Sequence, residues 1–225
     1  MIEQRTRIAH PATCDRETSV TRSLLGYGVI AGPVYVAVSL AQALTRDGFD
    51  LTRHSWSLLA NGDLGWIHIA NFMVTAAATL ACAVGLRRAL GPGRGGTWVP
   101  RLVAGYGVSL IAAGVFRADP AMGFPAGTPA GPGAVSWQGM LHLAAGAVGF
   151  TCLIAACFVI ARRFAAGGRR GWAGYSRLTG VLFLLSFAAI STGGGASWAT
   201  VTFVAGVVLA WAWLSALSLH LYRHA

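Results

Sequence analysis

The chain has 225 residues, of which 55% are hydrophobic and only 11% are charged. A single soluble core of this size does not bury so much apolar surface, so the composition excludes an ordinary soluble domain and favours a chain embedded in lipid. A formal net charge of +10 would suggest nucleic-acid binding if the arginines formed one patch, but their placement along the chain excludes that interpretation.

Six apolar runs predict an all-α integral membrane protein, a bundle of about six transmembrane helices. Each run is close to the roughly 20 residues that a helix needs to cross ~30 Å of hydrocarbon. The runs are residues 24–45, 64–86, 99–118, 137–162, 177–195 and 197–222. The fifth is the least regular, because three glycines follow Thr192 and predict a tight turn. The predicted domains are an N-terminal tail, residues 1–22, and a transmembrane domain, residues 23–225.

The arginines predict the orientation of the chain. All seventeen basic residues are arginine, and fourteen of them fall in the two terminal segments, in the connections after the second and fourth runs, or in the ends of runs that adjoin these connections. Only Arg46, Arg53 and Arg117 fall in, or at the edge of, the two long connections on the other side. Because arginine-rich loops stay in the cytoplasm, both termini are predicted to be cytoplasmic. The polar segment before Leu24 predicts no cleavable signal peptide, and the bias to arginine, alanine and glycine suggests a bacterial plasma membrane.

Two long connections lie on the predicted outer side of the membrane, residues 46–63 and 119–136. The second begins with Asp119-Pro120, which ends a helix, and continues with many glycines and prolines. A connection of this length and stiffness in a compact bundle more often forms the wall or lid of a pocket than an idle segment. A surface tether is the alternative interpretation.

Polar residues that are unusual in a membrane protein gather near the same outer boundary, whereas the middle of every run lacks charge. We expect these side chains to converge on one pocket. The candidate catalytic residues are His54, Asp119 and His142. The candidate binding residues are Arg53, Ser57, His68, Asn71 and Arg117.

Three interpretations of the candidate catalytic residues are open. A divalent metal such as zinc would take three protein ligands, although their spacing matches no metal-binding motif. Metal-free acid and base catalysis would use Asp119 with His142 as its partner. In a purely structural interpretation, Arg117 pairs with Asp119 and the histidines donate to backbone carbonyls.

Several short motifs carry a family resemblance. They are Arg53-His54-x-x-Ser57-Leu58, Gly65-Trp66, Ala70-Asn71-Phe72, Asp119-Pro120-x-x-Gly123-Phe124-Pro125-x-Gly127-Thr128-Pro129 and Gly139-x-x-His142. Together they resemble domain-of-unknown-function family nine-nine-eight, small multi-pass membrane proteins of bacteria and archaea, over about residues 24 to 222. The resemblance implies no activity, only that these segments belong to one external site. The chain has Leu143 where relatives often carry an acid, and His68 where the family has glutamine, which disfavours a three-histidine metal site.

These features predict a membrane-embedded enzyme or binding protein whose outer pocket takes a lipid, an isoprenoid or another hydrophobic small molecule. A small transporter or facilitator, acting as a homo-oligomer, is one alternative, but no carboxylate lies at the predicted midplane. An accessory membrane subunit is the other. The expected partners are the lipid bilayer and a hydrophobic ligand, not nucleic acid. A cofactor is neither predicted nor excluded by the sequence.

Overall fold

The computed structural model describes residues 11–225, with side chains from Arg16 onward, and this part of the chain is all-helical. Its helices are α1 (Pro11–Thr45), the short 3-10 helix η1 (Trp56–Ala60), α2 (Gly65–Leu90), α3 (Arg94–Val115), α4 (Trp137–Ala166), α5 (Arg170–Thr192) and α6 (Ser197–Tyr222). Six of them are long and apolar enough to cross a membrane. The prediction of an all-α bundle with about six transmembrane helices is confirmed.

Several helix bounds differ from the apolar runs. α1 begins at Pro11, inside the predicted N-terminal tail, and α5 begins at Arg170 rather than at residue 177. α2 and α4 likewise continue to Leu90 and Ala166. Hydropathy marks the stretch of a helix that suits lipid, whereas polar residues with good helix propensity extend the helix into water. The apolar runs therefore underestimate the lengths of these helices.

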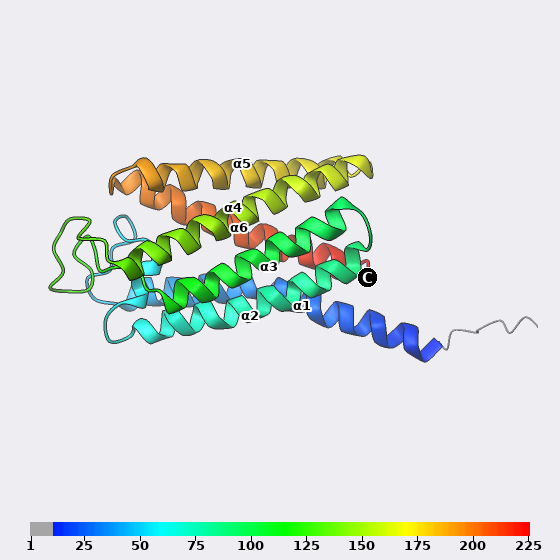
Figure 1. Cartoon of the computed structure of the whole chain (residues 1–225), viewed down its shortest axis with the longest axis horizontal. Coiled ribbons are helices and arrows are strands. Elements are labelled where there is room, and N and C mark those ends of the chain that lie inside the picture. Colours follow the sequence, from blue (N-terminus) through cyan, green and yellow to red (C-terminus); the bar gives the residue numbers. More distant parts are fainter. Residues whose placement is uncertain (1–10) are drawn as a thin grey trace, which may run out of the picture.

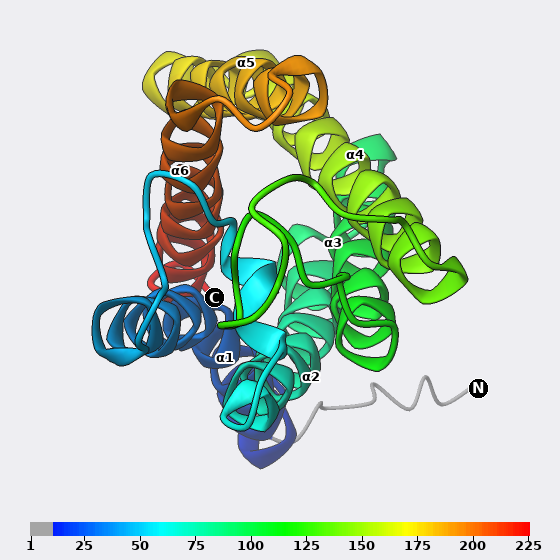
Figure 2. The same ribbon diagram turned by 90° about the vertical axis from the view of Figure 1, so that its left-hand side faces the viewer.

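The six long helices form a ring in chain order, in which each packs against its neighbours and α6 closes the ring against α1 (Figure 2). We call one end of this ring the loop end, because it carries the connections 46–64, 116–136 and 193–196. The other is the arginine-rich end, where α1 begins and α6 ends (Figure 1). α4 and α5 meet at the arginine-rich end and diverge toward the loop end (Figure 1).

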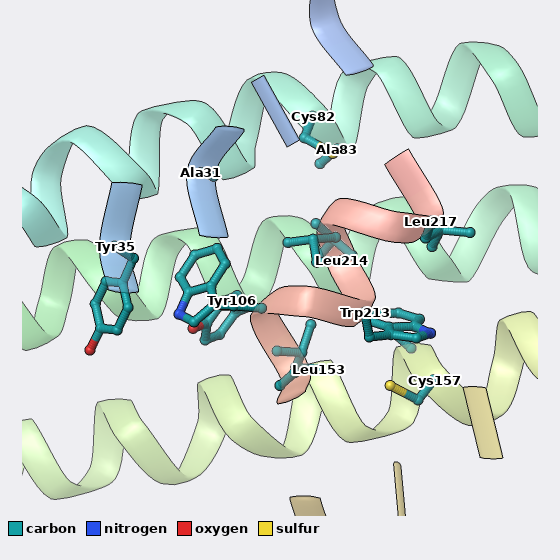
Figure 3. Close-up of a cluster of buried hydrophobic side chains, with 14 of the residues drawn as sticks. Ala31, Tyr35, Cys82, Ala83, Tyr106, Leu153, Cys157, Trp213, Leu214 and Leu217 are labelled. Carbon is teal, nitrogen blue, oxygen red and sulfur yellow. The ribbon is translucent and has the colours of Figure 1, made fainter. Parts of the chain in front are cut away.

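Large side chains of α6 fill the arginine-rich half of the ring. Figure 3 shows Trp213 and Leu214 between Cys82 of α2 and Cys157 of α4. All four side chains are fully buried. The indole nitrogen of Trp213 donates to the hydroxyl of Ser176 on α5 over 3.0 Å. This half of the bundle is therefore a close-packed core in which the buried indole nitrogen of Trp213 has a hydrogen-bond partner.

Small residues let α1 approach α6 in this half. A Cβ atom on Gly28 would overlap the side chains of Cys82 and Ser218, and one on Gly32 would lie 2.7 Å from the hydroxyl of Ser215. Glycine pairs at this spacing are typical of helix contacts within membranes, where close packing replaces the hydrophobic effect as the driving force. α6 is thus held near the middle of the ring at this end.

Candidate functional site

A cavity of about 390 Å³ occupies the loop-end half of the ring. All six long helices contribute to its lining, and the connections 46–64 and 116–136 cover it. Its walls are mainly apolar, with Leu110, Phe150, Phe203 and Val207 among them. A cavity of this size and character is typical of sites for small apolar or amphiphilic ligands.

Aromatic side chains form the floor of the cavity. Tyr35 and Tyr106 line it, and their ring centroids lie 5.2 Å and 5.4 Å from that of Trp211 below them. Tyr35 also contacts Phe72 and Trp56, with centroid separations of 6.1 and 6.0 Å. Because Trp211 is only 1% exposed, this aromatic layer separates the cavity from the packed half of the bundle.

Asp119 lies at the mouth of the cavity and caps α4 through Ser136. Its carboxylate accepts hydrogen bonds from the N–H and the hydroxyl of Ser136, over 2.7 and 2.6 Å. Ser136 is the N-cap residue of α4, and its hydroxyl oxygen accepts from the N–H of Gly139 over 3.1 Å. The carboxylate is therefore held at the positive end of the α4 dipole, where a negative charge is favoured.

His142 presents one ring nitrogen to the cavity. Its Nδ1 lies 2.8 Å from the carbonyl of Phe116 and 3.1 Å from that of Ala113, at the end of α3. Carbonyl oxygens only accept, so Nδ1 carries the hydrogen and donates to them. In the neutral ring Nε2 is then an acceptor, and it makes no hydrogen bond within residues 16–225. His142 therefore offers a free basic nitrogen in the lining of the cavity.

His54 holds the two loop-end connections together. Its Nδ1 accepts from the N–H of Asp50 over 2.8 Å, and its Nε2 donates to the carbonyl of Met122 over 3.0 Å. The hydroxyl and N–H of Thr52 donate to the Asp50 carboxylate, which lowers the pKa of Asp50 and orders the turn before His54. Since both ring nitrogens are engaged and His54 is 2% exposed, its side chain belongs to the roof of the cavity and not to its lining.

Arg46 completes the roof and was not among the candidate residues. Its guanidinium donates to the carbonyls of Leu59 and Asn61, over 2.7 and 2.6 Å, and lies 4.8 Å from the ring centroid of Phe124. Phe124 is 1% exposed, so its buried ring, packed against Arg46, anchors the connection 116–136 to the connection 46–64. One sequence signal points to Arg46: it is one of only three arginines outside the segments that the sequence predicts to be cytoplasmic.

The comparisons with known proteins give the family. The sequence matches the family described as "Protein of unknown function (DUF998)" over residues 29–220. The chain belongs to this family. The match confirms the resemblance drawn from the motifs, and its range includes every residue that lines the cavity. Comparisons with curated proteins and with solved structures return no significant match.

In this DUF998 chain, His68 and Asn71 lie between α1 and α2, behind the wall of the cavity. His68 is fully buried with Nδ1 3.4 Å from the amide nitrogen of Gln42, and the Asn71 amide donates to the carbonyl of Tyr35 and the hydroxyl of Ser39. Gln42 Oε1, His68 Nε2 and Asn71 Oδ1 are buried without a hydrogen-bond partner in the described part of the chain. Tyr35, 5.9 Å from His68 between ring centroids, lies between this polar cluster and the cavity.

The other candidates divide between the cavity and the surface. Arg53 and Ser57 line the cavity, together with Asp119 and His142. Arg117 is exposed and lies outside the lining, while Asp119 bonds to Ser136 instead. Among residues 16–225 no three histidine, cysteine, aspartate or glutamate side chains are grouped as metal ligands would be. Within the described residues, the four candidates that line the cavity are therefore not grouped as the ligands of one metal ion would be.

Proposed function

We propose that this DUF998 protein binds an amphiphilic small molecule, a lipid or an isoprenoid, in the loop-end cavity. The observation that carries the proposal is the division of the cavity, which has polar groups at its mouth and an aromatic and aliphatic interior. The polar group of the ligand would contact Arg53, Asp119 and His142, and its apolar part would lie against Phe150 and its neighbours. In this arrangement the polar part of the ligand meets the polar mouth of the cavity, and its apolar part meets the apolar interior.

We further propose that the loop end faces the outside of a bacterial plasma membrane. Support comes from the arginines: of the fifteen in the described residues, twelve lie in the connections of the arginine-rich end or in the adjoining parts of the helices. The loop end carries three arginines and four of the seven acidic residues, so it lacks the positive excess of a cytoplasmic face. The cavity would then open in the outer half of the bilayer.

A lateral route from the bilayer supports an amphiphile as ligand. α4 and α5 diverge toward the loop end (Figure 1), and residues on both helices line the cavity there. Leu143 of α4 is 62% exposed and Ser191 of α5 is also exposed, although both contribute to the lining. The rim between these helices therefore faces the surrounding lipid, and a molecule dissolved in the bilayer can enter without crossing water.

The mouth also supports a chemical role. His142 Nε2 is placed to accept a proton from a bound hydroxyl or water, and Asp119 is a second ionisable group at the same mouth. We propose His142 as the base of any reaction at this site, with Asp119 fixing the ligand and the end of α4. A transport function is disfavoured, because the aromatic layer under Tyr35 leads into close-packed side chains.

A tryptophan introduced into the cavity tests the proposal. Ala147 lines the cavity on α4, whereas its neighbour Val148 is 60% exposed and lies outside the lining. Native mass spectrometry of protein released from membranes in mild detergent is expected to show a lipid-sized adduct on the wild type and on Val148→Trp. Ala147→Trp is expected to lose at least about tenfold in occupancy, because its indole overlaps the ligand volume. Equal occupancy in all three proteins, or no adduct on the wild type, would exclude this ligand class from the cavity.

Replacing His142 by asparagine distinguishes the structural role of Nδ1 from the ligand-binding role proposed for Nε2. An asparagine amide retains a donor near the position of Nδ1, so the end of α3 stays capped and the melting temperature is expected to change by about 2 °C or less. The Nε2 acceptor is lost, and adduct occupancy should fall.

His142→Leu is the matched comparison, because it removes both nitrogens and leaves the carbonyls of Ala113 and Phe116 without their donor. That variant is expected to lose about 1–3 kcal/mol of unfolding free energy in thermal or denaturant unfolding. Full occupancy in His142→Asn would leave His142 as a cap of α3 and remove it from the site.

A further inference from the structure

A second cavity, of about 380 Å³, lies at the arginine-rich end and is unrelated to the ligand proposed above. It is formed by the ends of α2, α4 and α6 and by the connection before α5. Arg163, Arg169 and His224 line it together with the apolar side chains of Leu90, Phe164 and Leu221. The lining combines two arginines and a histidine with apolar walls, and none of its described side chains is acidic.

Arg163 supplies a fixed positive charge at this cavity. Its guanidinium donates to the carbonyl of Leu90 over 2.7 Å and to that of Pro92 over 3.4 Å. Its stem packs against Gly95, where a Cβ atom would lie 2.7 Å from Arg163 Cδ. Both hydrogen-bond partners are neutral, so the side chain is held in place while its charge is not neutralised.

Arg169 supplies a second positive charge and has N–H donors that make no hydrogen bond within the described residues. One of its terminal nitrogens lies 2.8 Å from His220 Nε2, and its guanidinium lies 6.0 Å from the ring centroid of Phe164. A guanidinium has five N–H donors, so most of them remain available. Arg169 also directly precedes α5, whose N-terminal amides add a partial positive charge beside it.

The side chains around the cavity offer little negative charge to balance these groups. Of the side chains that the structure describes at this end, only Glu17 is acidic, and it is exposed. The main-chain oxygen of Ala225 accepts a hydrogen bond from Arg22 over 2.7 Å, so it already has a cationic partner. His224 donates from Nδ1 to the carbonyl of His220 over 2.6 Å and adds a titratable ring to the lining.

We propose that this cavity binds a phosphate group, carried either by the headgroup of an anionic membrane lipid or by a free phosphate compound. Arginine is suited to phosphate because its planar fork donates two parallel hydrogen bonds, and basic pockets between transmembrane helices are typical lipid-headgroup sites. Arg169 donates hydrogen bonds to the phosphate, and the fixed charge of Arg163 keeps the electrostatic potential in the cavity positive. The buried walls Leu90, Phe164 and Leu221 match the apolar part of a lipid.

Substituting one arginine at a time tests the proposal. Arg169→Gln removes the positive charge and the forked guanidinium donors. Arg169 is exposed, and within the described residues its side chain makes one hydrogen bond, with His220, so the fold should persist. Arg162→Gln is the matched control, because Arg162 is also exposed at this end but lies outside the lining. Each protein is placed in phosphatidylcholine nanodiscs with increasing phosphatidylglycerol, and the unfolding temperature is followed as a measure of binding.

Phosphatidylglycerol is expected to stabilise the wild type and Arg162→Gln alike, and to bind Arg169→Gln about tenfold more weakly, the loss typical of one charge-assisted pair. Inorganic phosphate added to phosphatidylcholine nanodiscs separates the two sources of phosphate. An Arg169-dependent response to inorganic phosphate supports a free phosphate compound, and a response to phosphatidylglycerol alone supports a lipid.

An equal loss of binding in both variants would assign the effect to general surface charge and overturn the proposed site. No stabilisation by either probe would also overturn it. Adduct loss in Ala147→Trp has no bearing on this result.

Discussion

Replacing Arg46 by alanine is expected to lower the unfolding free energy by about 2–4 kcal/mol, which corresponds to a fall of roughly 5–10 °C in the melting temperature. The arginine donates to the carbonyls of Leu59 and Asn61 and contacts the ring of Phe124. Hydrogen bonds from a charged donor contribute about 1.5–3 kcal/mol each and the cation–π contact about 0.5–1 kcal/mol, with partial exposure reducing the sum. Thermal unfolding in detergent measures the change.

Two variants control this experiment. Arg53→Ala removes an exposed arginine of the same connection, so a change within about 0.5 kcal/mol is expected. Arg46→Lys keeps the charge but lacks the fork that reaches both carbonyls, so its stability should fall between those of Arg46→Ala and the wild type. Amide hydrogen exchange should become faster at residues 119–135 in Arg46→Ala, because the ring of Phe124 loses its contact with the Arg46 guanidinium. If Arg46→Ala were as stable as Arg53→Ala, Arg46 would not hold the roof.

The membrane architecture could be predicted from the sequence because hydropathy is a local property. Each apolar run contains enough residues to require burial in lipid, whatever its neighbours do. The positions where helices begin are different, since the extension of α1 to Pro11 and of α5 to Arg170 depends on polar residues that suit either helix or loop. The closure of the helices into a ring depends on contacts between distant segments, such as Gly28 with Ser218, that no single run contains.

The candidate site was predictable where a motif fixes both the backbone and the side chain. Asp119 precedes Pro120 in the connection that follows α3, and His142 lies one turn after Gly139 on α4, so both are brought to the mouth. His68 follows an equally regular helical pattern, but which face of α2 turns toward α1 is decided by packing of the whole ring. His54 and Arg46 lie in irregular connections, where no periodicity indicates the direction of a side chain.

Gly139→Ala is expected to disrupt the mouth of the cavity, whereas Gly146→Ala on the same helix is expected to be tolerated. A Cβ atom on Gly139 would overlap the carboxylate of Asp119, while the nearest atom to one on Gly146 is 3.7 Å away on the ring of Phe150. The Gly139 variant should therefore displace Asp119 from Ser136 and lose about 1–3 kcal/mol of stability together with the bound adduct. Gly146→Ala should gain up to about 1 kcal/mol, because alanine favours helix over glycine.

A double-mutant cycle assigns this effect to the carboxylate. Asp119→Ala alone should also be destabilising, because the N–H and hydroxyl of Ser136 lose their acceptor. Once Asp119 is alanine, the Cβ of Gly139→Ala has space, so the double variant should be about as stable as Asp119→Ala. The two changes are then strongly non-additive, with a coupling of about 1–3 kcal/mol. Additive losses in thermal unfolding would mean that Gly139 is required by the backbone of α4 itself, and that the close approach to Asp119 does not set the geometry of the mouth.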